Sequence, residues 1–106
     1  MKTSYGNLPD LGHARSLILR GLEGYAAEVF LFGSFARGQG TLGSDIDIAV
    51  LPLEPIPSEV FSSLRNDLEE APLLFSVELI DLSSTNWEFR ERVVREGVRW
   101  DESANA

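Results

Sequence analysis

The chain of 106 residues contains no cysteine and only one histidine. The lack of cysteine excludes disulfide bonds, thiolate zinc sites and cysteine catalysis. A single histidine excludes a metal site built from several histidines of one chain. Basic residues are also scarce, because 9 Lys and Arg stand against 17 Asp and Glu, which gives a net charge of −8. We therefore expect neither direct binding of nucleic acid nor attachment to an anionic membrane, since both depend on massed Lys and Arg.

Long hydrophobic runs are missing as well. The longest apolar stretches are far too short to span a bilayer, and no secretory leader is visible, because the stretch at 17–19 lies between two arginines. The composition, with 43% hydrophobic and 25% charged residues, is that of a soluble globular protein. We expect one domain over residues 1–106, located in the cytoplasm, with flexible ends at 1–8 and 101–106.

Hydrophobic periodicity divides the chain into alternating helices and strands. Candidate N-terminal caps are Ser58 for one helix and Ser83, Ser84 or Asn86 for the last. This order predicts an α/β (α+β) fold with three strands. The expected elements are a helix from Pro9 to about Tyr25, a strand at 29–32, one or two helical turns at 35–37, a flexible loop at 38–43, a strand at 44–51, a helix from Ser58 that ends before Pro72, a strand at 74–82 and a helix through Val98.

Acidic side chains are placed in an informative way on the second and third strands. Residues two apart on a strand share a face, so Asp45 and Asp47 lie on the same side with their Cα atoms about 6–7 Å apart. Glu78 occupies the polar face of the next strand and could supply a third carboxylate. Such a cluster suits one or two Mg²⁺ ions, because gathered acids repel one another unless a cation compensates. The alternative is that these residues form the solvated face of a half-exposed sheet.

A glycine turn follows the first strand. Gly33-Ser34 begins a helical turn whose backbone N–H groups would face an anion, and glycine lets a phosphate approach closely. Arg37 could clamp a phosphate, or it could form a structural salt bridge with the nearby aspartates. Phosphates held beside a carboxylate–magnesium site are what nucleotidyl transfer requires. The alternative for Gly33-Ser34 is a plain strand-to-helix turn.

The spacing of these two motifs resembles a known signature. Gly33-Ser34, followed after ten residues by Asp45-Ile46-Asp47, resembles the DNA polymerase β-type nucleotidyltransferase superfamily and most closely its minimal nucleotidyltransferase (MNT) branch. Residues 77–82 resemble the strand that carries the family's third acid, and 89–97 resemble its last helix. The resemblance implies a nucleotidyltransferase fold in which helices pack on a small three-stranded mixed sheet in the order 1-2-3.

The same resemblance implies roles for individual residues. Gly33 and Ser34 would hold the outer phosphates of the nucleotide. Asp45 and Asp47 would be catalytic Mg²⁺ ligands, and Glu78 would complete the acidic triad and could accept the proton of the attacking hydroxyl. The family more often has aspartate where Glu78 stands, and the longer side chain shifts the carboxylate by about an ångström.

A function follows from the resemblance too. MNT proteins are commonly encoded beside a HEPN-domain RNase toxin, and as antitoxins they transfer AMP from ATP to a tyrosine of that toxin. The resemblance therefore implies an enzyme that needs Mg²⁺ and ATP and has a HEPN-domain partner, in a hetero-oligomer or as a homo-oligomer. Two alternatives remain open at this point: an antitoxin that acts by binding alone, and nucleotidyl transfer to a small molecule.

The remaining polar and aromatic residues are expected to have structural or surface roles. They are His13 on the surface of the first helix, Asp81 as a cap or surface acid, Trp87 and Trp100 at the core edge or an interface, and the partly paired arginines Arg90, Arg92, Arg95 and Arg99.

Overall fold

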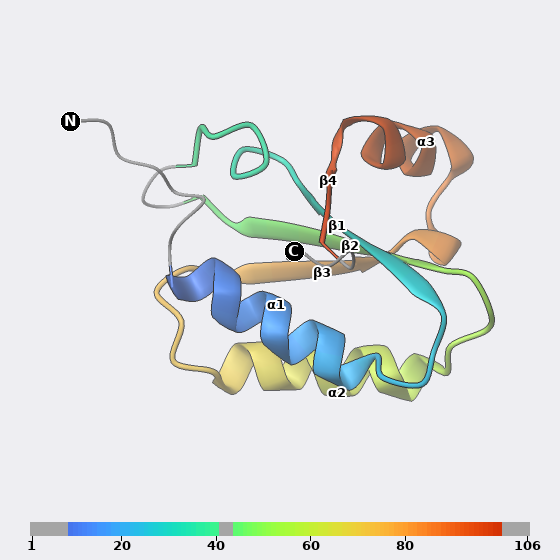
Figure 1. Cartoon of the computed structure of the whole chain (residues 1–106), viewed down its shortest axis with the longest axis horizontal. Helices are drawn as coiled ribbons and strands as arrows, with labels where there is room; N and C mark the ends of the chain where they lie inside the picture. Colours follow the sequence, from blue (N-terminus) through green and yellow to red (C-terminus); the bar gives the residue numbers. More distant parts are fainter. Residues whose placement is uncertain (1–8, 41–43, 101–106) are drawn as a thin grey trace.

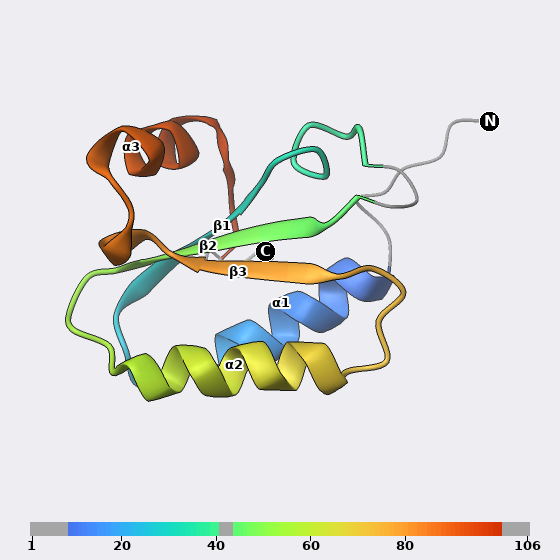
Figure 2. The ribbon, with the colours of Figure 1, turned by 180° about the vertical axis from the view of Figure 1, so that it is seen from behind.

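A mixed four-stranded sheet with helices on both faces organises the chain (Figures 1 and 2). The computed structural model describes residues 9–40 and 44–100. The expected flexible ends and residues 41–43 of the expected loop lie outside these described residues. The elements are α1 (Pro9–Gly21), β1 (Ala27–Phe32), β2 (Ile46–Pro52), α2 (Ser58–Glu70), β3 (Val77–Asp81), the 3₁₀ turn η2 (Leu82–Ser84), α3 (Trp87–Glu96) and β4 (Val98–Arg99).

The sheet has the strand order β3-β2-β1-β4. β1 is antiparallel to both β2 and β4, and β2 is parallel to β3. The parallel pair is joined by the crossover helix α2, as such a connection requires. The predicted α/β fold and the predicted strand order 1-2-3 are confirmed. The predicted count of three strands is wrong, because the sheet contains a fourth, short strand, β4.

The missed strand arises because the last helix stops earlier than predicted. α3 ends at Glu96 instead of continuing through Val98, and Gly97 is extended there with its N–H on the carbonyl oxygen of Val93 at 2.7 Å. A Cβ on Gly97 would lie 2.7 Å from that oxygen, so only glycine fits this exit. Val98 and Arg99 then pair with β1, and two residues are too few to show a strand period.

The other helix boundaries agree with the predictions in part, since the end of α1 and the cap of α2 differ, whereas the cap of α3 is one of its three predicted candidates. α1 ends at Gly21 and not near Tyr25, and Gly21 lies where an added Cβ would meet Leu64 of α2. Ser58 begins α2, but no side chain caps that helix, and Pro57 occupies the cap position. The cap of α3 is Asn86, whose side chain accepts a hydrogen bond from the N–H of Phe89 at 2.8 Å.

The third strand starts at Val77 and not at Leu74, because a tertiary contact holds the chain before it. The carboxylate of Asp10, buried at the start of α1, accepts a hydrogen bond of 2.8 Å from the N–H of Phe75. This contact joins residues 65 positions apart in the sequence and ties the segment before β3 to α1.

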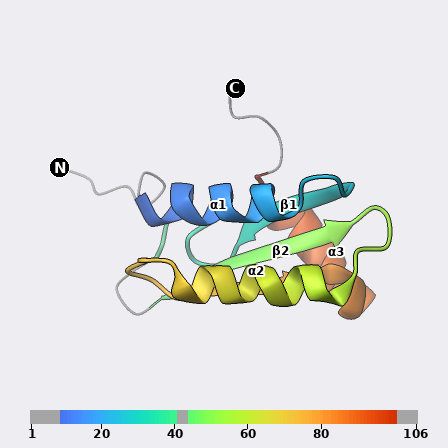
Figure 3. The same ribbon diagram turned by 90° about the horizontal axis from the view of Figure 1, so that it is seen from below.

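The helices make the two faces of the sheet unequal. α1 and α2 lie side by side and antiparallel beneath one face (Figure 3), and α3 lies on the other (Figure 1). The core under α1 and α2 contains the fully buried Ile18, Ile46, Ile48, Val50 and Leu64. A smaller cluster under α3 consists of Phe30, Ala49, Leu82 and Val93. In the described part of the chain no helix is both long and apolar enough to cross a membrane.

Candidate active site

The turn after β1 is shaped around Gly33. This residue has a φ of +79°, and a Cβ added there would meet the carboxylate of Asp47, with the Cγ atom 3.2 Å away. The turn closes through hydrogen bonds from Ala36 N to Gly33 O at 3.1 Å and from Gln39 N to Ser34 O at 2.8 Å. The backbone of Gly33 therefore lies directly against the side chain of Asp47, which brings the two predicted motifs together.

A buried phenylalanine fixes this turn to the core. Phe35 is only 3% exposed, and its ring packs edge-on against the ring of Phe75 with centroids 5.2 Å apart. Gly40 lies against the Phe35 ring from the other side, where a Cβ would overlap it. The turn is thus held rigidly by apolar packing while Gly33 and Ser34 stay partly exposed.

The carboxylates gather where β2 and β3 run side by side. In the sheet register Asp47 has Phe32 of β1 on one side and Glu78 of β3 on the other. Burial, the negative charges of Glu78 and Asp45, and a hydrogen bond with Glu78 raise the pKa of Asp47 from 3.8 to about 6. Asp47 is half-buried, whereas Asp45 and Glu78 are exposed. The predicted acids therefore share one region of the sheet, with Asp47 at its centre.

The chemistry of this region fits a hard divalent cation. Within residues 9–40 and 44–100, no three acidic or histidine side chains stand close enough to enclose a metal ion by themselves. Mg²⁺ does not need such a cage, because it is typically held by one or two carboxylates together with water and substrate phosphates. The negative charge concentrated around Asp47 is the kind that a cation relieves.

Arg37 lies beside the turn and not on the aspartates. Its side chain is exposed and its Nε donates to Gln39 Oε1 at 3.4 Å, and among the described residues it forms no ion pair. The salt bridge considered for Arg37 is therefore absent there. Its role toward phosphate stays a prediction, as do the predicted roles of the other site residues.

A cleft of about 340 Å³ opens between this turn and α3, and the sequence did not reveal it. Phe89 packs edge-on against Phe32 with centroids 5.8 Å apart, and the guanidinium of Arg92 lies 5.8 Å from the centre of the Phe89 ring. The helical spacing of residues 89, 92, 93 and 96 was the available signal, since it places them on one face. The cleft is lined by Phe32, Gly33, Ala36, Arg37, Phe89, Arg92, Val93 and Glu96.

The other residues named from the sequence lie mostly where they were expected. Asp81 is a cap, accepting hydrogen bonds from Ser83 N at 2.9 Å and Ser83 Oγ at 2.7 Å. His13 is exposed, Trp87 is 63% exposed, and Trp100 packs partly buried against the core. Two arginines form ion pairs, Arg95 with Glu91 at 4.0 Å and Arg99 with Glu28 at 3.7 Å.

Comparison with known protein families assigns this fold and site to a class of nucleotidyltransferases. The family model described as Polymerase beta, Nucleotidyltransferase matches residues 23–100 of this chain. The chain belongs to that family, because the match covers more than half of its length.

Named relatives sharpen the position within the family. The chain is 36% identical over 69 residues to the protein adenylyltransferase MntA of Shewanella oneidensis, covering 65% of this chain and 49% of that protein. It is 33% identical over 63 residues to the probable protein adenylyltransferase MntA of Haemophilus influenzae, covering 59% of this chain and 55% of the relative. The chain thus spans about half the length of the curated relatives that it matches.

A similar fold occurs in a solved toxin–antitoxin complex. The structure of the tri-AMPylated Shewanella oneidensis HEPN toxin with its MNT antitoxin matches with a TM-score of 0.64 and 25% identity, covering 91% of this chain and 72% of the other. The resemblance to the MNT branch is therefore confirmed.

Proposed function

We propose that this protein is an Mg²⁺-dependent nucleotidyltransferase that moves AMP from ATP to a tyrosine hydroxyl of a HEPN-domain toxin. The observation that carries the proposal is the contact of the Gly33 backbone with the Asp47 carboxylate, with Glu78 beside Asp47 in the sheet register. This contact supports the proposal, because a phosphate held by the turn would lie beside a cation held by the carboxylate.

The proposed reaction is a single displacement at phosphorus. The tyrosine oxygen forms a bond to the α-phosphorus of ATP, and the bond from that phosphorus to the oxygen bridging to the β-phosphate breaks. Pyrophosphate leaves with that oxygen, and the tyrosine proton passes to a nearby base. Positioning and charge neutralisation supply most of the acceleration in such transfers.

Residues of this chain would divide the work as follows. The backbone of Gly33 and the hydroxyl of Ser34 would hold the outer phosphates, with Arg37 at the edge of the same turn. Asp45 and Asp47, with Glu78, would hold Mg²⁺, which supplies neutralisation of the phosphate charge when bound. The list of proposed site residues is Gly33, Ser34, Arg37, Asp45, Asp47 and Glu78.

The choice of acceptor is supported by the relatives. Proteins similar to this chain are named protein adenylyltransferases, and the similar solved complex contains a HEPN toxin carrying AMP. AMP on a toxin tyrosine adds bulk and negative charge, which would hinder RNA binding by sterics and repulsion. We place this reaction in the cytoplasm, with residues 1–106 acting as one nucleotidyltransferase domain in a hetero-oligomer with the toxin.

The test combines this protein, ATP and Mg²⁺ with the purified HEPN-domain protein encoded beside it, followed by intact mass spectrometry of that protein. We expect mass steps of one AMP, located on a tyrosine by fragmentation and absent when that tyrosine is replaced by phenylalanine. Neutralisation of the toxin with no change in mass would replace this proposal with an antitoxin that acts by binding alone.

A further inference from the structure

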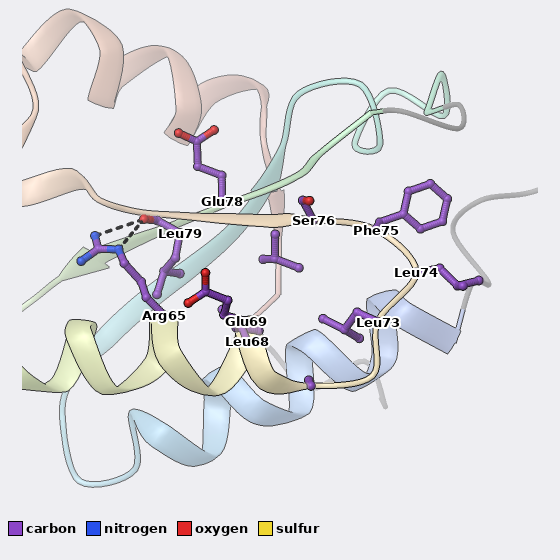
Figure 4. A pocket seen from close by; sticks show the side chains of 11 residues that line it. Arg65, Leu68, Glu69, Leu73, Leu74, Phe75, Ser76, Glu78 and Leu79 are labelled. Atoms are coloured by element: carbon purple, nitrogen blue, oxygen red, sulfur yellow. Dashed lines mark hydrogen bonds between the residues drawn. The ribbon is translucent and has the colours of Figure 1, made fainter.

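A groove of about 620 Å³ runs along the outer edge of the sheet, between the end of α2 and the start of β3 (Figure 4). Its walls come from α2, from the connection at 71–76 and from β3 itself, and Glu78 lies at its rim. We propose that this groove binds an extended, basic segment of the protein acceptor as an additional strand beside β3, which presents the acceptor tyrosine to the catalytic face. This inference rests on the proposed function and deepens it.

The backbone of β3 is available for such pairing. Within the part of the chain that the structure describes, β3 is an edge strand, and β2 is its one neighbour in the sheet. The carbonyl of Ser76 accepts a hydrogen bond from Ile46 N at 2.8 Å, so the groups of Ser76 face β2 and those of Val77 face outward. The same alternation turns the groups of Leu79 outward, and an outward N–H with an outward carbonyl on Val77 is what an incoming strand pairs with.

One arginine limits where a segment can pair. The guanidinium of Arg65 donates to the carbonyl oxygen of Leu79 from Nε at 3.2 Å and from Nη2 at 3.1 Å. That acceptor is therefore already used, whereas the N–H and carbonyl of Val77 and the N–H of Leu79 face outward. The open stretch of the edge thus lies next to Glu78 and not at the far end of the strand.

The two sides of the open stretch differ in chemistry. Figure 4 shows Glu78 pointing from β3 away from α2, while Glu69 reaches from α2 toward β3. Side chains of an added strand would alternate in the same way, one into the groove beside Leu68 and Leu73 and the next toward the face of Glu78. A tyrosine in the second position would bring its hydroxyl toward the predicted base.

The charge of the groove favours a basic segment. Among its described lining residues two acidic side chains, Glu69 and Glu78, outnumber one cationic side chain, Arg65, whose position is fixed by its bonds to the Leu79 carbonyl. Leu74 adds an apolar contact at the open end, where its side chain is 89% exposed.

The groove is also connected to the nucleotide turn. Phe75 lines the groove, is fixed by the hydrogen bond of its N–H to Asp10, and packs against Phe35 of the turn after β1. Two lining residues thus connect the groove to the proposed active site: Phe75 contacts Phe35 below the glycine turn, and Glu78 lies beside Asp47. This continuity with the proposed site favours an acceptor over an unrelated partner.

The first test uses two substitutions and a matched control. Leu74→Arg places a positive charge where a basic segment would lie, and Val77→Pro removes an outward N–H without removing a bond to β2, which an edge strand tolerates. We expect each to raise KM for the neighbouring HEPN-domain protein about tenfold, with KM for ATP unchanged. The control is Leu53→Arg, which makes the same charge change at a leucine 59% exposed at the other end of α2 and should leave both constants unchanged.

The second test does not depend on activity. Hydrogen exchange at the amides of Val77 and Leu79 should slow in the complex with the HEPN-domain protein, because an added strand protects them. If the wild type transfers AMP and Leu74→Arg and Val77→Pro leave KM for the HEPN-domain protein unchanged, the proposed strand pairing in the groove is wrong. Unprotected amides in the complex would also show this. Either result would leave the proposed function standing. Absence of AMP transfer by the wild type would instead overturn the proposed function and this inference with it.

Discussion

The two faces of the central sheet are built from the same strands and have opposite properties. On the face under α1 and α2, β2 contributes Ile46, Ile48 and Val50, all fully buried. On the face toward α3, the same strand contributes Asp47 and Ala49, and Asp47 stays half-buried beside Glu78. The buried face under α1 and α2 stabilises the fold. This stability offsets the repulsion on the other face, where carboxylates lie close enough to raise the pKa of Asp47.

The separation of stability and chemistry between the faces makes adjacent residues respond differently to substitution. The largest effect is expected for the double substitution Asp45→Asn, Asp47→Asn. It should lower AMP transfer by more than about 100-fold, because it removes the charge that holds the cation. The free energy of unfolding should hold or rise, since repulsion within the acidic cluster is relieved. Transfer is measured by intact mass and stability by urea unfolding.

The matched control lies one residue further along β2. Ile48→Ala removes a fully buried side chain on the other face and should lower the free energy of unfolding by about 2–5 kcal/mol. Full transfer activity in the double aspartate variant would disprove the metal assignment, and a strong loss of its stability would disprove the separation of the faces.

A smaller effect on transfer should distinguish steric overlap from backbone strain at two glycines. Gly33 and Gly38 both have positive φ, at +79° and +71°, but a Cβ on Gly33 would meet the Asp47 carboxylate and one on Gly38 would meet nothing within 4 Å. Gly38→Ala should therefore cost only the strain, about 1 kcal/mol of stability, with transfer nearly intact. Gly33→Ala should cost that strain and also lower transfer at least tenfold more than Gly38→Ala does, as measured by initial rates.

Equal losses of transfer in Gly33→Ala and Gly38→Ala would show that the contact between the turn and Asp47 does not matter for the reaction. Gly33→Val adds a β-branched side chain at the same place, and its loss of transfer should exceed that of Gly33→Ala.

The hydroxyl of Ser34 should matter less than the backbone of Gly33. Ser34→Ala should weaken the use of ATP by about 10- to 150-fold, which corresponds to a lost hydrogen bond of about 1.5–3 kcal/mol to a charged group. Thermal unfolding should change little, because the backbone bonds of the turn do not use this hydroxyl. If Ser34→Ala changes neither the ATP dependence nor the turnover, the turn that contains Ser34 has a structural role only.

The smallest effect is expected in the pH dependence of stability. The folded protein holds a proton on Asp47 up to about pH 6, whereas the unfolded chain releases it near 3.8. The free energy of unfolding should therefore fall as the pH rises from about 4 to about 6, by about 1 kcal/mol after allowance for solvent screening. In Asp47→Asn this part of the fall should be absent, as measured by urea unfolding without Mg²⁺ at each pH.

The same proton should affect the reaction in the opposite direction. In the proposed mechanism a proton on Asp47 competes with Mg²⁺, so at low Mg²⁺ concentration activity should increase as the pH rises, and higher Mg²⁺ should shift this increase to lower pH. A wild-type stability profile that matches Asp47→Asn across this range would contradict the raised pKa.

Local patterns in the sequence predicted the faces of β2 correctly, because Ile46, Ile48 and Asp47 follow the two-residue period of a strand. The order of the three longer strands was implied by the resemblance to the nucleotidyltransferase superfamily and not by these local patterns. They did not predict β4, since Val98 and Arg99 are too few to show a period and form a strand only by pairing with β1.

Contacts between distant parts of the chain were likewise beyond local patterns. The hydrogen bond from Phe75 to Asp10 joins residues 65 positions apart, and β3 begins after it, so the strand is shorter than predicted. The spacing of Gly33-Ser34 and Asp47 indicated a common site, but the close approach of Gly33 to the Asp47 carboxylate follows from the antiparallel register of β1 and β2.

The bond from Arg65 to Leu79 also has a consequence for the protein in concentrated solution. An exposed edge strand is a template on which further copies add and aggregate. Three residues of β3 turn their backbone outward, and two of their carbonyls are occupied, that of Leu79 by Arg65 and that of Asp81 by Ser84 Oγ at 2.9 Å. These two side chains confine the open part of the edge to the short stretch around Val77, which should limit edge-to-edge pairing between copies while leaving room for the proposed acceptor segment.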